Sequence, residues 1–208
     1  MVRHPSSASS VSAPPVLYGR RVTLRPLREQ DFAEWSEVRR RNDAWLTPWE
    51  PRRPGGQLDP TVSRDAFAAR CAARERDSAS GLAYGFGLFV DRRLVGEINL
   101  NHVLRGAMQS ATVGYWIDQD WAGQGLVAEG VVVLAEFAFT QLDLHRLEIC
   151  IVPRNSNSRR VMEKLGFREE GVAERFLEIN GVWEDHVRYG FTVEEWAARE
   201  DELRERWL

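Results

Sequence analysis

The stretch WAGQGLVAEG, from Trp121 to Gly130, carries Gly123 and Gly125 one residue apart, directly before a long apolar run. Glycine has no Cβ atom and adopts the left-handed backbone conformations that tight turns need. The pair is therefore compatible with a simple turn from a strand into a helix. It is equally compatible with a loop that points the bare N–H groups of a helix N-terminus at an anion. The glycines alone do not decide between these interpretations.

Two common phosphate-binding loops do not fit this stretch. A Rossmann loop needs a third glycine and a place in the first βαβ unit, and a Walker loop ends in Gly-Lys-Ser or Gly-Lys-Thr. Residues 121–130 have neither feature. An anion site at this position would therefore belong to a different fold.

Strand patterns precede the glycine stretch. Residues 81–90 (GLAYGFGLFV) and 94–103 (LVGEINLNHV) flank a short polar turn, which predicts a hairpin. Residues 111–118 (ATVGYWID) predict a third strand, in which Gly114 indicates a bulge or a close approach by another backbone. This third strand would lead directly into the glycine stretch.

A helix and a second buried strand follow the glycines. The apolar run predicts a helix from about Glu129 to Gln141, and residues 145–152 (HRLEICIV) predict the strand. Residues 155–167 (NSNSRRVMEKLGF) predict a short helix with polar caps at its start. Parallel strands at 111–118 and 145–152 that splay apart would leave unpaired backbone groups between them. A ligand with amides of its own could fill such a gap.

The outer parts of the chain complete a mixed sheet. Residues 47–60 form a loop rich in proline and glycine, and Asn180-Gly181 is a strong two-residue hairpin signal. The other predicted strands are 18–27, 169–179 and 182–192, and the other predicted helices are 28–42 and 61–77. The order β-α-α-β-β-β-α-β-α-β-β predicts an α/β (α+β) fold, in which a mixed central sheet carries helices on both faces.

Length and composition fit one globular domain. The chain has 208 residues, is 43% hydrophobic, has a formal net charge of -3, and has no apolar run long enough to span a membrane. This charge argues against a general nucleic-acid binder.

Residues 1–15 are rich in Ser, Ala and Pro and lack the apolar core of a signal peptide. We therefore expect a disordered tail at 1–15, a single domain over 16–208 and a cytoplasmic protein. Cys71 and Cys150 match no metal motif and are expected to be small buried residues.

Four segments together resemble the GNAT family of acetyl-coenzyme A-dependent N-acetyltransferases, and within it the RimJ/RimL branch of ribosomal-protein N-terminal acetyltransferases. They are VTLRPLREQDFAEW (22–35), VGYWIDQDWAGQGLVAEG (113–130), LHRLEICIVPRNSNSRRVMEKLGF (144–167) and LEINGVWEDHVRYGF (177–191). The resemblance runs from Arg20 to Phe191. It implies a GNAT fold with splayed central strands, and acetyl-CoA as co-substrate without a metal.

The resemblance assigns the glycine stretch to the coenzyme pyrophosphate. The family motif Arg/Gln-x-x-Gly-x-Gly/Ala falls on residues 122–127. The residues expected to bind the pyrophosphate through their backbone are Gly123, Gln124, Gly125, Leu126 and Val127. Ala122 replaces the usual polar first residue and Val127 a small last one, so the detailed contacts of the loop stay open.

The resemblance also places the rest of the coenzyme. Trp116, Ile117 and Asp118 would line the pantetheine arm through backbone bonds, and the amide near Ile117 would polarise the thioester carbonyl. Asn155 would contact the coenzyme, and Ser158 would lie near its sulfur and could protonate the leaving thiolate. The alternative for Asn155 and Ser158 is a helix-capping pair.

A coenzyme phosphate could also be reached by an arginine of the same segment, Arg159 or Arg160. A solvated helix face is the alternative reading of these side chains. The site prediction includes Arg160.

A base should deprotonate the acceptor amine, directly or through water. Glu97 and Glu148 lie within apolar strands, where burial would raise the pKa of each carboxyl group toward neutrality. The alternative for both is an ion pair with Arg21, Arg25 or Arg146. Glu178 is a third candidate, next to the position where a relative's proposed base would fall. Positioning of two substrates with little help from side chains is a further possibility.

The acceptor side is indicated by aromatic residues. Trp45 and Trp49 lie in or beside the Pro-rich loop and are candidates for the acceptor pocket, because exposed loop aromatics usually bind something. His186 could line the same groove, or could be a structural histidine. His102, His145 and His186 do not form a metal-spaced set.

Three functions remain open. The first is an N-acetyltransferase acting on a protein N-terminus, of the ribosomal-protein alanine or serine type, by direct transfer in a ternary complex. The second has the same chemistry with a small amine as acceptor, such as an antibiotic, a polyamine or an amino acid. The third is an acyl-CoA-binding regulator without catalysis. We expect no direct contact with nucleic acid or membrane, and a monomer or a homodimer.

Overall fold

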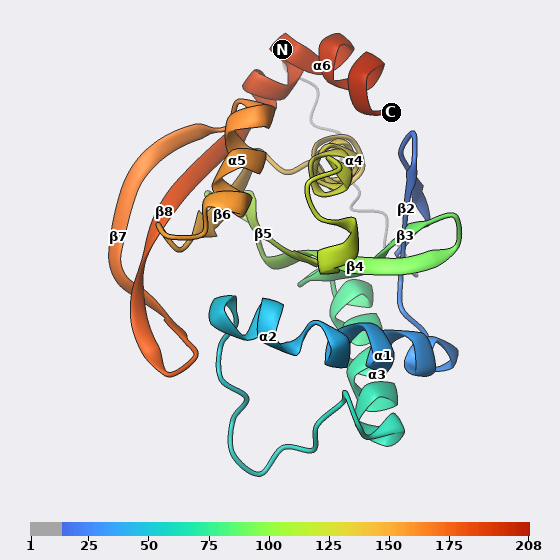
Figure 1. Ribbon diagram of the computed structural model, residues 1–208. Helices are drawn as coiled ribbons and strands as arrows, with labels where there is room; N and C mark the ends of the chain where they lie inside the picture. The colour runs from blue at the N-terminus through green and yellow to red at the C-terminus, as the bar shows by residue number, and fades with distance from the viewer. Residues whose placement is uncertain (1–13) are drawn as a thin grey trace.

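The central sheet of the computed structural model, which describes residues 14–208, has eight strands in the order β1-β2-β3-β4-β5-β6-β8-β7 (Figure 1). The strands are β1 (Leu17–Tyr18), β2 (Val22–Arg25), β3 (Tyr84–Val90), β4 (Arg93–Leu104), β5 (Ser110–Ile117), β6 (Arg146–Ile151), β7 (Arg168–Ile179) and β8 (Val182–Thr192). Only β5 and β6 pair in parallel; the other neighbours are antiparallel. The predicted mixed sheet is confirmed.

Helices cover both faces of this sheet. They are α1 (Phe32–Arg41), α2 (Asp43–Leu46), α3 (Arg64–Ala79), α4 (Leu126–Thr140), α5 (Ser156–Leu165) and α6 (Val193–Trp207), with single 3-10 turns η1 (Glu29–Asp31), η2 (Thr47–Trp49) and η3 (Gln119–Trp121). Ala111 and Val113 of β5 pack into the core that contains α4 and α6, whereas Trp116 packs on the other side against Trp35 and Phe67 of α1 and α3. Figure 1 shows α4 and α6 on one side of the sheet and α1, α2 and α3 on the other.

The two parallel strands splay apart, as predicted. Their pairing covers only Ser110 with Arg146, Ala111 with Leu147 and Thr112 with Glu148, although β5 continues to Ile117. The Asp118 N–H donates to the Val95 carbonyl oxygen of the preceding strand at 2.8 Å. Because antiparallel hydrogen bonding alternates, the backbone groups of Tyr115 and Ile117 then point away from β4 and into the gap beside β6.

Three local expectations need correction. Helix α4 begins at Leu126 rather than near Glu129, so it starts directly after the glycine loop. The predicted bulge at Gly114 is wrong, because Gly114 pairs regularly with Asn99 and the register shifts only beyond Asn101. The close backbone approach occurs at Gly96, where an added Cβ would lie 2.2 Å from the Trp116 carbonyl oxygen.

The predictions for the β7–β8 hairpin, the C-terminal helix and the two cysteines have different outcomes. The hairpin between β7 and β8 turns at Asn180 and Gly181, with φ values of 46° and 86°, as the sequence indicates. Helix α6 was missed. Cys71 and Cys150 are free and half-buried rather than buried. The predicted tail at 1–15 lies outside the described residues except for its last two. Within residues 14–208, no helix has the length and apolarity needed to cross a membrane.

Candidate active site

A cavity of about 520 Å³ opens at the gap between β5 and β6. Its walls come from both sides of the sheet: the start of α4 and of α5 on one side, and α2 and η2 on the other. The lining residues are Trp45, Leu46, Trp49, Glu50, Tyr115, Trp116, Ile117, Trp121, Ala122, Gly123, Gly125, Leu126, Val127, Ala128, Asn155, Asn157, Ser158, Arg160, Val161 and Lys164. The cavity therefore connects the two faces of the sheet through the gap.

The glycine loop has the geometry of an anion-binding nest. Gly123 and Gly125 have φ values of 76° and 82°, in the left-handed region that glycine adopts without strain. The Glu129 N–H donates to the Gly125 carbonyl oxygen at 3.0 Å, so the N–H groups of the three preceding residues of α4 have no intrahelical acceptor. Those residues line the cavity, where the positive end of the helix dipole favours an anion. The interpretation as a nest is thus supported over that of a simple turn.

Glu129 anchors this loop without blocking it. The side chain of Glu129 is 1% exposed, accepts from the backbone N–H of Val22 at 2.9 Å and pairs with Arg21 Nε at 2.8 Å. Arg21 Nη1 in turn donates to the Gln124 carbonyl oxygen at 3.1 Å. The Gln124 side chain bonds to Asp120 and does not line the cavity. Any contact of Gln124 with a ligand would therefore have to come from its backbone.

Two cations of α5, Arg160 and Lys164, line the cavity. Lys164 lies at the glycine loop, where a Cβ added to Gly125 would be 3.2 Å from Lys164 Nζ. The positive end of α4 and Lys164 therefore act together on an anion placed at the glycine loop.

The backbone of β5 lines the middle of the cavity, with one exception to the prediction. Trp116 and Ile117 line the cavity, and Trp45 Nε1 donates to the Ile117 carbonyl oxygen at 3.1 Å. Asp118 lies outside the lining, because its N–H is bonded to Val95 and its carboxylate, 1% exposed, to Arg41 and Asn42. Burial alone would raise the pKa of Asp118, but the bonds from Arg41 and Asn42 outweigh burial and hold that pKa below its usual value. The structure therefore does not support the expected pantetheine contact of Asp118.

Asn155 and Ser158 form the predicted capping pair, and their roles toward the coenzyme stay predictions. The Asn155 side-chain oxygen accepts from the Ser158 N–H at 3.1 Å, so Asn155 caps α5. Both residues also line the cavity. The Tyr115 hydroxyl donates to the Ser158 carbonyl oxygen at 3.4 Å, which fixes the first turn of α5 beside β5.

Glu97 does not have the environment predicted for a base. Its carboxylate is 2% exposed and accepts from Trp35 Nε1 at 2.6 Å and from Arg70 at 2.5 Å. Burial, the largest single influence, would raise the pKa of Glu97, but the attraction of Arg70 and the hydrogen bonds from Arg70 and Trp35 together outweigh it, and the pKa lies below its usual value. Glu97 lines a second cavity beneath α3 rather than the one at β5 and β6. The predicted raised pKa is wrong, and the paired alternative holds with Arg70 as partner.

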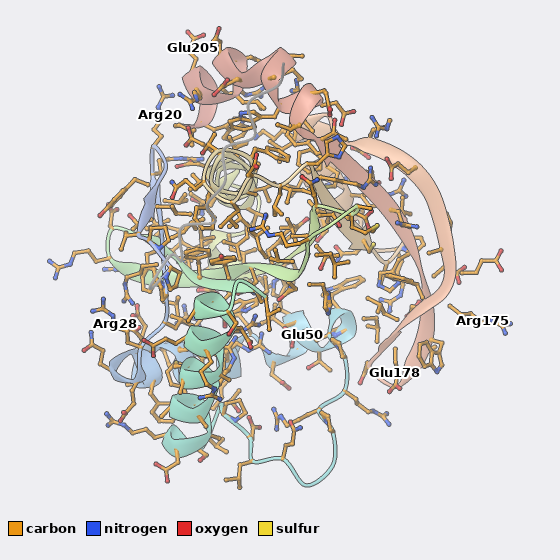
Figure 2. All side chains as sticks on the ribbon, turned by 180° about the vertical axis from the view of Figure 1, so that it is seen from behind. Arg20, Arg28, Glu50, Arg175, Glu178 and Glu205 are labelled. Carbon is orange, nitrogen blue, oxygen red and sulfur yellow. The ribbon has the colours of Figure 1, made fainter. Side chains whose placement is uncertain are left out.

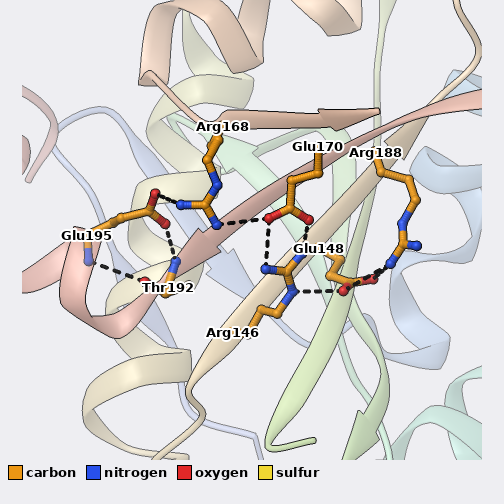
Figure 3. A network of polar contacts seen from close by, with 7 residues as sticks. All are labelled: Arg146, Glu148, Arg168, Glu170, Arg188, Thr192 and Glu195. Atoms are coloured by element: carbon orange, nitrogen blue, oxygen red, sulfur yellow. Dashed lines mark hydrogen bonds and ion pairs between the residues drawn. The ribbon is translucent and has the colours of Figure 1, made fainter. Parts of the chain in front are cut away.

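Glu148 also lies outside the cavity. It is half-buried on β6, where it pairs with Arg146 at 2.8 Å and with Arg188 at 3.2 Å (Figure 3). The ion pair with Arg146 was the stated alternative to a buried base. Glu178, the third candidate, lies on the β7–β8 hairpin and does not line the cavity either (Figure 2).

The predicted acceptor residues separate into two groups. Trp45 and Trp49 line the cavity on the side of α2 and η2, and the Arg154 guanidinium stacks on the Trp49 ring at 4.7 Å. His186 is 3% exposed, lies outside the lining, and contacts the Phe176 ring edge-on at 5.7 Å. The alternative of a structural histidine fits His186. Among residues 14–208, no group of three or more His, Cys, Asp or Glu side chains is placed to hold a metal ion.

Several lining residues are not among those that the sequence predicts. They are Leu46, Glu50, Tyr115, Trp121, Ala128, Asn157, Val161 and Lys164. Glu50 follows Trp49 directly in the Pro-rich loop, and its place next to a predicted acceptor residue is the sequence feature that indicates it as a lining residue. Lys164 lies in the last turn of α5, and its place in the cavity depends on the packing of α5 beside α4, which the sequence does not show.

The sequence and the fold match those of known acetyltransferases. Residues 21–168 match the family model described as Acetyltransferase (GNAT) domain. The chain therefore belongs to the GNAT family and is an acetyl-CoA-dependent N-acetyltransferase.

Individual relatives extend this likeness over most of the chain. The [Ribosomal protein uS5]-alanine N-acetyltransferase of Escherichia coli (strain K12) is 30% identical over 85% of this chain and 90% of its own. YjcK of Bacillus subtilis (strain 168), named as a probable N-acetyltransferase, is 35% identical over 82% of this chain and 93% of its own. The structure of Mycobacterium smegmatis RimJ in complex with CoA-disulfide matches 93% of this chain and 97% of its own with a TM-score of 0.83 and 31% identity.

Proposed function

We propose that this protein acetylates the N-terminal α-amine of a protein, of the ribosomal-protein alanine or serine type. The observation that carries the proposal is the cavity that passes through the sheet at the β5–β6 gap, with an anion nest at one end and tryptophans at the other. The likeness to the E. coli uS5-alanine enzyme and to M. smegmatis RimJ supports a protein N-terminus as the acceptor.

The nest fits the diphosphate of acetyl-CoA. The backbone of Gly123, Gly125 and the first residues of α4 would bind it, with Lys164 and Arg160 adding positive charge. The pantetheine arm would lie in the gap, where the backbone groups of Tyr115 and the N–H of Ile117 would face its amides, while the Ile117 carbonyl oxygen accepts from Trp45.

The gap would bring the thioester to the acceptor on the other side of the sheet. The amine nitrogen would attack the thioester carbon, with the Ile117 N–H stabilising the oxygen that gains charge. The C–S bond then breaks, the nitrogen would release its proton to water, and the thiolate would be protonated by the predicted donor Ser158, which regains a proton from solvent. Direct transfer in a ternary complex requires no covalent enzyme intermediate, and positioning supplies much of the rate.

The test is incubation with acetyl-CoA and peptides that begin with Ala or Ser, with release of free thiol as the readout. Mass spectrometry should place one acetyl group on the α-amine. The same peptides with a blocked N-terminus, but with internal lysines, serve as controls. Acetylation of lysine alone, or no turnover with any peptide, would contradict the proposed acceptor.

A small amine is the second candidate acceptor, and one observation favours it. The acceptor side of the cavity is bridged: Arg154 donates to the Pro48 carbonyl oxygen at 3.3 Å, and the Asn180 N–H donates to the Glu50 carbonyl oxygen at 2.9 Å. This bridge joins η2 to the β7–β8 hairpin and limits the width of the entrance. A panel of polyamines, amino acids and aminoglycosides, assayed beside the peptides, distinguishes the two acceptors by kcat/KM.

A further inference from the structure

The charges that line the active-site cavity are divided between its two ends. Lys164 lies at the glycine-loop end, and Arg160, one turn earlier on α5, also lines the cavity. Among the residues that the structure describes, Glu50 is the only acidic side chain in the lining, and it follows η2 at the other end. In Figure 2, Glu50 lies beside α2, on the face of the sheet opposite α4. The cationic end of the cavity suits an anionic coenzyme. The Glu50 carboxylate at the other end suits a cation.

Glu50 is held firmly by Arg39 of α1. Arg39 Nη1 and Nη2 donate to the two carboxylate oxygens of Glu50 at 2.7 Å and 2.6 Å. Burial, the largest single influence, would lower the pKa of Arg39, but the bond to Glu50 and the attraction of the nearby carboxylates together outweigh burial, and the Arg39 pKa lies above its usual value. The guanidinium also stacks on the Trp116 ring at 5.0 Å. The carboxylate is thus fixed relative to β5, whose backbone lines the gap.

Glu50 keeps the capacity to bind a second donor. The Glu50 side chain is 33% exposed, whereas that of Arg39 is 18% exposed and Arg39 is not in the cavity lining. The carboxylate is therefore the member of the pair that faces the cavity. An ionised carboxylate has about four lone-pair positions, of which Arg39 occupies two. The other charged groups nearby, Arg154 and Glu184, pair with each other at 2.5 Å.

We propose that the Glu50 carboxylate is the subsite that binds the charged amine of the acetyl acceptor, and that Arg39 is the positioning residue that aims it. The inference rests on the proposed function in one respect: it requires an acceptor that enters the cavity as an ammonium. An α-amine, with a pKa of about 8, is mostly protonated at neutral pH, so recognition by a carboxylate captures its main form. Loss of a proton then precedes attack.

The first test compares Glu50→Gln with Glu29→Gln. Glu29 is an exposed carboxylate that pairs with Arg64 at 2.9 Å and lies outside this cavity, so its substitution removes an equal charge elsewhere. For Glu50→Gln, we expect the KM of the acceptor to rise by roughly tenfold or more, as loss of a charge-assisted hydrogen bond implies. The KM of acetyl-CoA should match that of Glu29→Gln, whereas the thermal midpoint of Glu50→Gln should be the lower one, because the Arg39–Glu50 pair is less exposed than the Glu29–Arg64 pair. An unchanged acceptor KM would overturn the inference.

The second readout is the pH dependence of kcat, which reports ionisation in the enzyme–substrate complex. A neighbouring carboxylate raises the pKa of a bound ammonium. In the plot of kcat against pH, the rising limb reports loss of the proton from this ammonium, and Glu50→Gln should move that limb to lower pH by roughly one unit. A purely structural role of Glu50 would lower activity without moving this limb. Arg39→Lys should raise the acceptor KM while leaving the limb near its wild-type position, because the carboxylate remains.

A binding measurement separates this inference from the proposed protein acceptor. Alaninamide, a minimal α-ammonium, is titrated calorimetrically into wild-type protein and Glu50→Gln, both saturated with CoA. Weaker binding to Glu50→Gln supports the subsite even when no peptide is acetylated. Equal binding to the two proteins, equally absent binding included, overturns it even when peptides are acetylated.

Discussion

At the scale of single residues, Gly125 links backbone conformation to coenzyme binding. Its φ of 82° costs a residue with a Cβ about 1–2 kcal/mol, and the new methyl group would meet Lys164 Nζ at 3.2 Å. We expect Gly125→Ala to raise the KM of acetyl-CoA roughly tenfold, because the strain moves the donors of the nest. Steady-state kinetics with varied acetyl-CoA measures this effect.

Gly106→Ala is the matched control. Gly106 has a φ of 68° and open space around its missing Cβ, and it lies outside the active-site cavity. It should lose similar stability with no change in the KM of acetyl-CoA. Equal KM values for the two variants would mean that the glycine loop is only a turn.

Glu97 is predicted to stabilise the fold rather than to act as a base. Removing one partner of a buried ion pair costs about 3–5 kcal/mol, and Glu97 is 2% exposed against Arg70 and Trp35. Glu97→Gln should therefore lower the free energy of unfolding by about 3 kcal/mol, measured by denaturant titration. The pH dependence of kcat in the surviving folded fraction should keep its wild-type midpoint. A shifted midpoint would restore Glu97 as a candidate base.

At the scale of elements, substitutions of the N-caps of α5 and α6 distinguish an effect on stability from an effect on coenzyme binding. Asn155 accepts from the Ser158 N–H and also lines the cavity, whereas Thr192 accepts from the Glu195 N–H at the start of α6, outside the cavity. Asn155→Ala and Thr192→Ala should each cost about 1 kcal/mol of unfolding free energy. Only Asn155→Ala should also raise the KM of acetyl-CoA. A rise of equal size in both variants would show that the effect is indirect.

Element boundaries followed from the sequence where local chemistry sets them. The Asn180-Gly181 turn and the Gly166 C-cap adopt the left-handed conformations that their residue types predict. Helix α4 was placed too late, because Leu126 and Val127 were assigned to the loop. Helix α6 was missed although Thr192 and Glu195 form a capping box, since its apolar residues, Trp196, Leu203 and Trp207, are sparse.

At the scale of the whole molecule, contacts between distant segments explain which site residues the sequence could not predict. The glycine loop is a local feature and was found. The sequence does not distinguish Glu97 as a buried base from Glu97 in an ion pair. Its partner, Arg70, lies on α3 and reaches Glu97 only in the folded chain. Trp45 was chosen for its exposure, but its bond to the Ile117 carbonyl oxygen crosses 72 positions of sequence. Burial and partners of ionisable groups are tertiary properties, and they decide pKa.

An ionic network holds the last two strands of the sheet and predicts how the molecule responds to acid. Glu170 of β7 is bonded by Arg146 of β6 and by Arg168, and Arg168 also pairs with Glu195 of α6 (Figure 3). The Arg146 bond is the main reason that the Glu170 pKa falls from 4.5 to about 2. Because the folded pKa is the lower one, this stabilisation is complete above pH 4.5 and is lost as pH falls toward 2.

Glu170→Gln should therefore be less stable than wild type at pH 7, and its unfolding free energy should change less between pH 4.5 and pH 2. Denaturant titrations at a series of pH values measure both effects, with Glu205→Gln, on the exposed end of α6 (Figure 2), as the control that keeps the wild-type acid dependence. Parallel curves for wild type and Glu170→Gln between pH 4.5 and 2 would place the acid sensitivity elsewhere in the molecule.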